Sequence, residues 1–452
     1  MSTLRVLANG ASVGTLDVAD GLWSFVYAPD WSVYALSPSF PLATRSYQDS
    51  GDARRLEWFF ENLLPEGRLR ELIASRDRID PKDTWALLIR HGRDTAGALT
   101  LIPDEIDHPD VEERLVPLAR EALQAKIKES RTRNLPLMAS WDDIRMSLAG
   151  AQEKLGLRID ANGALFLPEG TAASTHIVKP ENASADFPFC PCNEFFCMQL
   201  AAELKIPVPA VDLLHLPEPL YVIDRFDRES AEAKGAAGNA IRRLHQIDLC
   251  QALGVSPTKK YESEGGLGLH HLFEVVRSAF IDRPIVATSA VVQWVAFNYL
   301  VGNLDAHAKN IAFLMRGQKA AVAPFYDMLC VEAYLPRATM SMSIAGENKP
   351  GWVEGLHWDA MAFEAGAAPR LVRGVLSRMN SDLPDAISRA IGDERLVPAE
   401  RDFIREKILP VIEERRQFLT DAMKSRQSTL PDLLKSRDLS PDVVDRIQSL
   451  QG

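Results

Sequence analysis

The sequence contains few cysteines, and they do not form the pairs that a metal site or a disulfide framework needs. Five cysteines occur among 452 residues, and three of them, Cys190, Cys192 and Cys197, crowd together without a second closely spaced pair downstream. Structural zinc sites usually combine two such pairs of ligands, and disulfide frameworks use an even number of cysteines in a short secreted chain. The sequence therefore predicts neither, and we expect the thiols to be reduced.

Long apolar runs are also missing. No stretch of 18 residues is both uncharged and wholly apolar, and the opening segment MSTLRVLANG lacks a basic stretch followed by a long apolar one. A membrane-spanning helix needs about 20 predominantly apolar residues, and a secretory signal needs a basic start before its apolar core. We therefore expect a cytoplasmic protein that does not contact a membrane.

The sequence also lacks an excess of positive charge. Lys and Arg number 51 against 62 Asp and Glu, which gives a formal net charge of −11. A small basic cluster formed by Lys126, Lys128, Arg131 and Arg133 is typical of a solvated surface. Binding to nucleic acid depends on a positive field, so we expect any contact with DNA to be local or to depend on a partner protein.

The composition is that of an ordinary folded protein, with 46% hydrophobic and 25% charged residues. The length of 452 residues suggests two or three domains. The first hundred residues predict short strands, including a hairpin across Asn9-Gly10, and two helices that meet at Pro65-Glu66-Gly67. Beyond residue 240 apolar residues recur at helical spacing, which predicts helices over 246–253, 285–300, 369–379 and 402–423. Two short amphipathic pieces within 425–452 either pack or fray.

The strongest group of chemical residues is the segment GNLDAHAKN at 302–310, followed seventeen residues later by Asp327. Transfer of phosphate from ATP needs a carboxylate to orient the acceptor hydroxyl, and an amide oxygen with a second carboxylate to hold Mg²⁺. Asp305, Asn310 and Asp327 meet that need if 311–314 and 320–323 form a hairpin that returns Asp327 beside Asn310. The alternative is that Asp305 and Asn310 only cap neighbouring helices.

Three upstream features add to this pattern. The small-residue loop at 147–154 precedes a predicted hairpin, and its backbone amides can face phosphate oxygens, although a glycine there is commonly just a turn. Lys179 ends an apolar strand, where an isolated lysine is usually a solvated edge residue. The strand at 220–223 runs into a charged segment, as at a hinge that holds adenine. The order of these elements is that of a two-lobed kinase.

The segments SLAGAQEK, THIVKP, NEFFC, DRFDR, LCQALG, KYESEGG, NLDAHAKN and FYD closely resemble the HipA family of bacterial serine/threonine kinase toxins. Upstream, FFENLLPEG and GRDTAGAL resemble the N-terminal domain of that family. The resemblance spans about residues 4–380. The signatures of ordinary protein kinases, G-x-G-x-x-G, H-R-D and D-F-G, are missing.

The resemblance implies an α+β, two-lobed kinase-like fold with a β-rich N-terminal subdomain and N-lobe and a mainly α-helical C-lobe, with regions at 1–112, 113–226 and 227–452. It implies Asp305 as the catalytic base and Lys309 as the residue that neutralises the transferred phosphate, while His307 is either a nucleotide contact or a structural residue. The remaining implied contacts to ATP and Mg²⁺ are Ala149, Gly150, Ala151, Gln152, Glu153 and Lys154 in the phosphate loop, Lys179 at the α- and β-phosphates, Asp224, Arg225 and Phe226 at the adenine hinge, and Asn310 and Asp327 as metal ligands.

The resemblance also implies partners and regulation. Family members work with a small helix-turn-helix antitoxin, HipB, and the pair represses its own operon, so operator DNA is contacted through the complex. Known family substrates are aminoacyl-tRNA synthetases, glutamyl-tRNA synthetase above all, whose inhibition stalls translation and favours dormancy. Ser147 matches the self-phosphorylated serine of the family, and we expect its phosphate to be held by a cation such as Arg225 or Arg228. Two alternatives are a catalytically silent co-repressor and a small-molecule kinase.

Overall fold

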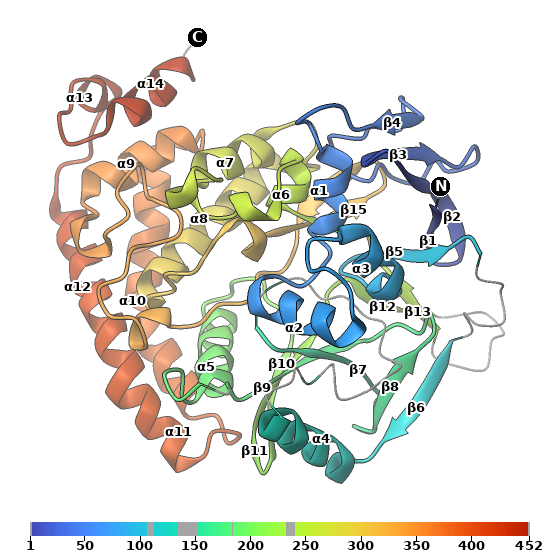
Figure 1. The fold of residues 1–452 in the computed structure, drawn as a ribbon. Helices are drawn as coiled ribbons and strands as arrows, with labels where there is room; N and C mark the ends of the chain where they lie inside the picture. Colours follow the sequence, from blue (N-terminus) through green and yellow to red (C-terminus); the bar gives the residue numbers. More distant parts are fainter. Residues whose placement is uncertain are drawn as a thin grey trace. The chain divides into compact units, whose positions relative to one another are not determined.

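A computed structural model describes residues 2–105, 113–133, 137, 150, 152–182, 184–231 and 240–450. The chain divides into two compact units, each assembled from three separate segments. Unit 1 comprises Met1–Ala183, Pro209–Pro257 and Ala312–Ala323, and unit 2 comprises Ser184–Val208, Thr258–Ile311 and Pro324–Gly452. Unit 1 holds the sheets and unit 2 holds most of the long helices (Figure 1), so the predicted α+β class is confirmed. The predicted boundary at residue 112 lies outside the described residues.

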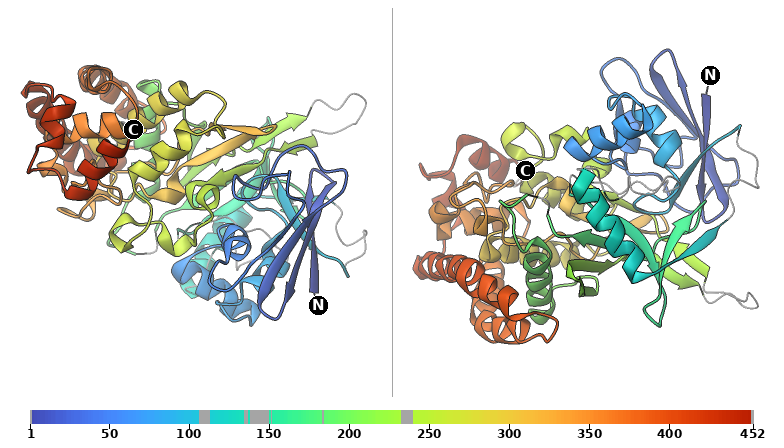
Figure 2. Two further views of the ribbon diagram at one scale, coloured as in Figure 1. Left: turned by 90° about the horizontal axis from the view of Figure 1, so that it is seen from above. Right: turned by 60° about the horizontal axis from the view of Figure 1, so that its bottom comes forward.

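The first sheet of unit 1 is antiparallel, with five strands in the order β4-β3-β2-β1-β5. These strands are β1 (Ser2–Ala8), β2 (Ala11–Ala19), β3 (Leu22–Tyr27), β4 (Ser46–Gln48) and β5 (Leu99–Pro103). The predicted hairpin is confirmed, because Asn9 and Gly10 both take positive φ, as the tight turn between β1 and β2 requires. Helices α1 (Arg55–Glu61), α2 (Gly67–Asp77) and α3 (Thr84–His91) lie to one side of this sheet, as Figure 2 shows.

The second sheet of unit 1 has six strands in the order β10-β11-β9-β7-β8-β6. They are β6 (Arg114–Leu118), β7 (Leu155–Ile159), β8 (Leu165–Glu169), β9 (His176–Pro180), β10 (Val211–Leu216) and β11 (Glu218–Asp224), and helix α4 (Arg120–Arg133) follows β6. Leu123 and Ile127 of α4 and Leu69 and Ile73 of α2 share one buried apolar cluster with the strands. Removal of this apolar surface from water stabilises the sheet by about 25 cal/mol per Å².

Two smaller sheets complete unit 1. One pairs β12 (Arg228–Ala231) with β13 (Ala240–Arg243), and the other has β14 (Gln246–Asp248), β15 (Ala312–Arg316) and β16 (Lys319–Val322) in that order. The predicted hairpin before Asp327 is therefore confirmed. The helix predicted over 246–253 is wrong in its first three residues, because β14 pairs with β15 and only α6 (Leu249–Leu253) is helical.

Unit 2 is built around helix α8 (Pro284–Val301), which packs against α7 (Leu269–Arg277), α10 (Pro369–Ile391) and α12 (Leu409–Lys424). The other helices of unit 2 are α5 (Cys190–Glu203), α9 (Gly355–Glu364), α11 (Pro398–Phe403), α13 (Leu430–Leu434) and α14 (Pro441–Ser449). A π-helical stretch at Ile404–Ile408 joins α11 to α12. All five cysteines of the chain lie in the described residues and are buried, and none forms a disulfide.

Helix α8 is the one helix within the described part of the chain that is long and apolar enough to cross a membrane. The helix has no charged residue, and its Thr288, Gln293 and Asn298 explain why no wholly apolar stretch was found in the sequence. Within the protein, 61% of it is buried. Its place against α7, α10 and α12 accounts for its apolar character as that of a core helix.

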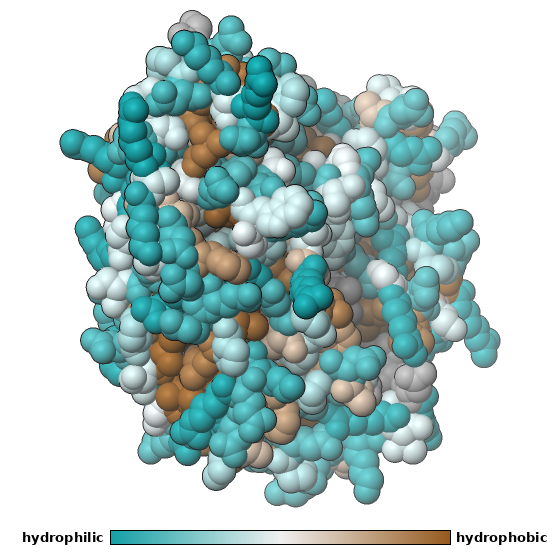
Figure 3. All heavy atoms as spheres, turned by 90° about the vertical axis from the view of Figure 1, so that its left-hand side faces the viewer, coloured by the Kyte–Doolittle hydropathy of each residue, from teal (hydrophilic) through white to brown (hydrophobic). Residues whose placement is uncertain are grey.

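The C-terminal helices pack rather than fray. Leu433 of α13 and Val443 and Ile447 of α14 are buried in an apolar cluster with Ala345 and with Ala360 of α9. The face shown in Figure 3 is largely hydrophilic, with hydrophobic residues in small patches, as expected for a chain with many charged residues.

Candidate functional site

The predicted catalytic loop leaves the C-terminal end of α8. The helix ends at Val301, and Gly302 caps it with a φ of 68°. Glycine takes this left-handed conformation without the steric cost that a Cβ atom brings. In the loop that follows, Asp305 is exposed whereas residues 307–310 are buried. The Asp305 carboxylate therefore lies where an acceptor hydroxyl can reach it.

Asn310 and Asp327, which are seventeen residues apart, lie in contact. Asn310 Nδ2 donates a 2.8 Å hydrogen bond to Asp327 Oδ2, and Asn310 Oδ1 is buried with no hydrogen-bond partner. A buried acceptor without a partner costs about 1–3 kcal/mol, and Mg²⁺ prefers carboxylate and amide oxygens. An unpartnered amide oxygen next to a carboxylate fits a magnesium ion, which these two residues would hold.

The backbone at Asp327 is unusual for a residue with a side chain. Its φ is 60°, a left-handed conformation that aspartate tolerates better than most residues. Contacts hold the segment just before it, since the Phe325 amide donates to Pro207 O at 2.8 Å and the Tyr326 hydroxyl donates to Lys309 O at 2.8 Å. Such conformations persist where the surroundings enforce them, and they concentrate at functional sites.

His307 and Lys309 are both buried in the loop. The His307 ring packs edge-on against Tyr261, with 5.1 Å between the ring centroids, and the Ala308 amide donates to Lys260 O at 3.3 Å. These contacts favour the structural role that the sequence left open for His307. The roles predicted for His307 and Lys309 in phosphate transfer stay predictions.

Lys179 lies in unit 1, on the buried strand β9. It pairs in register with Tyr221 of the neighbouring β11, and its Nζ lies 5.7 Å from the centroid of the Tyr221 ring. Its side chain is 6% exposed, so it is not a solvated edge lysine. The ring contributes a cation–π contact to the position of the ammonium group, and the predicted contact of Lys179 to the α- and β-phosphates stays a prediction.

The hinge segment follows β11, and Arg225 there makes hydrogen bonds within the protein, while its predicted contact to adenine stays a prediction. The Arg225 amide donates to Thr175 O at 2.8 Å, and its carbonyl accepts from the Arg228 amide at 3.1 Å. The Arg225 guanidinium is also buried against acidic residues. Asp224 is exposed and pairs with His176 Nε2 at 2.9 Å, and the adenine contacts of Asp224 and Phe226 stay predictions.

The described part of the phosphate loop is Gly150 and Gln152–Lys154, whereas Ser147, Ala149 and Ala151 lie outside the described residues. Gly150 has a φ of 107°, and its carbonyl accepts from the Glu66 amide at 3.2 Å. The Glu153 carboxylate braces the loop, because it accepts from the Leu137 amide and from Ser130 Oγ at 3.3 Å. Burial raises the pKa of Glu153, and the predicted contact of Glu153 to a phosphate stays a prediction.

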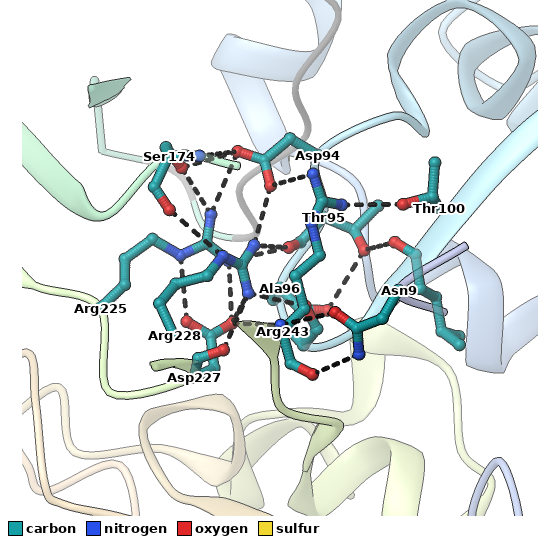
Figure 4. Close-up of polar contacts among 12 residues, drawn as sticks. Asn9, Asp94, Thr95, Ala96, Thr100, Ser174, Arg225, Asp227, Arg228 and Arg243 are labelled. Atoms are coloured by element: carbon teal, nitrogen blue, oxygen red, sulfur yellow. Dashed lines mark hydrogen bonds and ion pairs between the residues drawn. The ribbon is translucent and has the colours of Figure 1, made fainter. Parts of the chain in front are cut away.

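A buried polar cluster, which we call the arginine cluster, lies behind the hinge (Figure 4). Two carboxylates hold it together. Asp94 accepts from Arg228 at 2.8 Å and from Ser174 Oγ at 2.6 Å, and Asp227 accepts from Arg225 at 2.8 Å and from the Gly97 amide at 2.7 Å. The third arginine of the cluster is Arg243, which donates to Thr100 Oγ1 at 2.8 Å and to the carbonyls of Arg93 and Thr171.

The arginine cluster corrects the predicted role of Arg225 and Arg228 as holders of a phosphate on Ser147. Both side chains are 2% exposed. All five N–H groups of each guanidinium face acceptors within the protein. These arginines join the N-terminal subdomain to the hinge, and the DRFDR motif owes its arginines to that connection.

One residue that the sequence analysis did not single out belongs to the site. Asn303 is buried, and its Oδ1 accepts from the Asp305 amide at 3.3 Å. Asn303 lies within the quoted segment NLDAHAKN, but nothing in that segment indicates what its side chain contacts, so only the fold reveals its role. The described site residues form two groups, the catalytic and metal residues in unit 2 and the nucleotide residues in unit 1.

Comparison with known protein families gives two matches that together cover most of the chain. Residues 146–387, more than half of the chain, match the HipA-like C-terminal domain, and residues 4–102 match the HipA N-terminal domain. The first match contains the catalytic loop, Lys179 and Asp327, and the second contains the five-stranded sheet.

Individual proteins agree with the domain matches. The putative kinase Y4mE of Sinorhizobium fredii is 34% identical over 379 residues, covering 82% of this chain and 87% of the relative. The serine/threonine-protein kinase toxin HipA of Shewanella oneidensis is 31% identical over 414 residues, covering 86% and 91%. A solved complex of Shewanella oneidensis HipA, HipB and operator DNA gives a TM-score of 0.79 at 28% identity, covering 94% of this chain and 100% of that one.

Proposed function

This chain belongs to the HipA family and is a protein serine/threonine kinase, and on that premise we propose that it is the toxin of a toxin–antitoxin pair that phosphorylates an aminoacyl-tRNA synthetase. The observation that carries the proposal is the contact between Asn310 and Asp327, with the buried, unpartnered Asn310 Oδ1 in the unit that also exposes Asp305. This arrangement supports a metal-dependent phosphoryl transfer rather than a binding function alone.

The proposal gives each residue of the site a role. Asn310 and Asp327 would hold magnesium, which would supply positive charge to offset the negative charge that develops on the transferred phosphate. Asp305 accepts the proton of the serine hydroxyl as the serine oxygen bonds to the γ-phosphorus and the bond from that phosphorus to ADP breaks. Lys179 contacts the α- and β-phosphates, with Gly150, Gln152 and Lys154 around them, and Asp224 and Phe226 meet the base. Lys309 neutralises the phosphate in transfer.

Glutamyl-tRNA synthetase is the proposed acceptor, and its phosphorylation would stall translation and promote dormancy. The test is transfer of γ-labelled phosphate from ATP to a panel of purified synthetases and small hydroxyl metabolites, with the Asp305→Asn protein as the blank. Label on a synthetase serine supports the proposal. Label only on metabolites would instead make the protein a small-molecule kinase, and no label on any acceptor would favour a silent co-repressor.

We further propose an antitoxin of the HipB type as the partner in the cytoplasm. The solved relative is a complex with HipB and operator DNA, and this chain matches both the HipA N-terminal domain and the HipA-like C-terminal domain. A short helix-turn-helix protein encoded beside this chain should co-purify with it and recruit it to operator DNA, where the pair represses its own operon. Failure of the two proteins to associate would contradict this partner.

Self-inactivation through Ser147 completes the proposal. A phosphate adds about −1.5 to −2 charges in the loop that wraps the triphosphate, so modification should lower ATP affinity. Mass spectrometry after incubation with Mg·ATP should find phosphate on Ser147 of the active protein and none on the Asp305→Asn protein. An unmodified Ser147, or full ATP affinity after modification, would remove this switch.

A further inference from the structure

Asn303 connects the two acidic residues of the active site through their backbones. Its side-chain Oδ1 accepts from the Asp305 amide at 3.3 Å, and its Nδ2 donates to the Asp327 carbonyl at 3.4 Å. The asparagine is 4% exposed, so water does not compete for these contacts.

The core of unit 2 fixes Asn303 in turn. Its Nδ2 also donates to Asn298 Oδ1 at 2.7 Å, and its own amide donates to Asn298 O at 2.9 Å. Asn298 lies in the last turn of α8, and its Nδ2 donates to Trp294 O at 2.9 Å. A continuous set of hydrogen bonds therefore runs from the rigid helix through two buried asparagines to the catalytic loop and the metal-binding segment.

The chemistry of the amide group suits this position. One amide supplies an acceptor for the Asp305 N–H and donors for two oxygen atoms, a combination that neither aspartate nor leucine offers. The Asp327 backbone needs such support, because its φ of 60° is sparsely populated outside glycine. Loss of the donation to its carbonyl would let this segment relax toward an ordinary conformation and move the carboxylate.

We propose that Asn303 is a positioning residue that sets the catalytic base Asp305 and the metal ligand Asp327 relative to each other. The inference rests on the proposed roles of these two residues and adds to them the element that holds both. A displacement of about 1 Å at a reacting group costs about 10²-fold in rate. Substitution of Asn303 should therefore reduce kcat and raise the magnesium concentration needed for activity, with little change in the KM for ATP.

The test compares Asn303→Ala with Asn62→Ala. Asn62 is a matched control in unit 1, since it is 2% exposed and donates to the carbonyls of Trp58 and Val255 at 2.8 and 3.1 Å. Both variants should lose similar thermal stability. Asn303→Ala should lose about 10²-fold in kcat and need more Mg²⁺, whereas Asn62→Ala should keep both wild-type values. If Asn303→Ala does not fold, Asn303→Asp removes the donations at constant volume and should show the same losses.

A readout besides activity separates this inference from the proposed function. Binding of Mn²⁺ in the presence of ADP, followed by electron paramagnetic resonance, should weaken in the Asn303 variants and not in Asn62→Ala. Wild-type kcat and wild-type Mn²⁺ affinity in Asn303→Ala, or losses equal to those of Asn62→Ala, would overturn the positioning role. A wild-type protein that binds Mn²⁺ but transfers no phosphate would count against the proposed function. In that case the Mn²⁺ affinities of Asn303→Ala and Asn62→Ala, compared with that of the wild type, would still decide the role of Asn303.

Discussion

Asp305 is exposed, so its replacement tests chemistry with little effect on folding. Asp305→Asn should reduce phosphate transfer by about 10²- to 10⁴-fold, the usual contribution of a general base, while ATP binding, which depends on other residues, is kept. Transfer of γ-labelled phosphate and a melting curve measure the two effects. Asp282→Asn, another exposed aspartate of unit 2, is the control, and wild-type transfer by Asp305→Asn would refute the assignment.

Asp327 combines a charge with a left-handed backbone, and two substitutions separate them. Asp327→Ala removes the carboxylate and also places a residue that resists positive φ at this position, whereas Asp327→Asn keeps a residue that tolerates it. Both substitutions should weaken Mg·ATP binding by about tenfold or more, and each factor of ten corresponds to about 1.4 kcal/mol of binding free energy. Only Asp327→Ala should also lower the melting temperature clearly. Calorimetric titration with Mg·ATP measures the affinity, and a wild-type value in both variants would mean that another residue holds the ion.

The sequence predicted the reactive residues better than the residues that support them. Asp305, Asn310 and Asp327 carry a recognisable spacing, because metal and base chemistry permits few residue types. The role of Asn303 and the full burial of Arg225 could not be predicted, because each depends on groups that only the fold brings close. Asn303 depends on Asn298 and on the Asp327 carbonyl. Arg225 depends on Asp94, which lies 131 positions away in the sequence. A polar residue with a distant partner looks the same in the sequence as one that faces solvent.

The arginine cluster joins turns and strands of the N-terminal subdomain to the hinge, and its stability should depend on pH. Burial acts to raise the pKa of Asp94, but the guanidinium groups of Arg225, Arg243 and Arg228 outweigh it and hold the pKa well below its usual range. Because the pKa in the folded state lies below that of an unfolded carboxyl group, the stabilisation is complete at neutral pH and is lost as the pH falls below about 4.

Asp94→Asn should therefore destabilise unit 1 by about 3–5 kcal/mol at pH 7, because it leaves buried guanidinium charge without its carboxylate. The difference from wild type should shrink as the pH falls below about 4. Urea unfolding at pH 7 and pH 3 measures it. Asp104→Asn is the control, since Asp104 pairs with Arg5 at 3.4 Å but is 62% exposed and should change stability by less than about 1 kcal/mol. Equal effects of the two substitutions would show that the cluster contributes no more than a surface pair.

Element prediction succeeded where local signals agree and failed where a distant strand decides. Asn9-Gly10 and Pro65-Glu66-Gly67 are strong local signals, and the hairpin and the helix boundary that they predict are present. Residues 246–248 have helical spacing in the sequence but form β14, because β15, more than sixty residues later, supplies its hydrogen bonds. Tertiary pairing of this kind overrides local preference.

The whole chain is acidic, and its small basic cluster on α4 is largely neutralised. Lys126 and Arg133 pair with Glu129 at 3.1 and 3.0 Å, and Arg131 pairs with Glu218. With a net charge of −11, the protein alone should not shift operator DNA in a gel at about 150 mM salt, because binding driven by counterion release needs local positive charge. A basic antitoxin should restore the shift, and a shift by the isolated protein would contradict this expectation.

The arginine cluster also has a consequence for how the protein is made on the ribosome. Asp94 meets Arg225 only after 131 further residues, and Asn9 meets Arg243 only after 234. At roughly 5–20 residues per second, Asp94 waits about 7 to 26 s for its first arginine. During that interval Asp94 is present in the nascent chain, but the arginines of the hinge segment have not yet been synthesised. The N-terminal subdomain therefore cannot bury Asp94 in its final environment on its own. The order of synthesis therefore makes the arrival of residues 225–243 the event that completes the N-terminal subdomain.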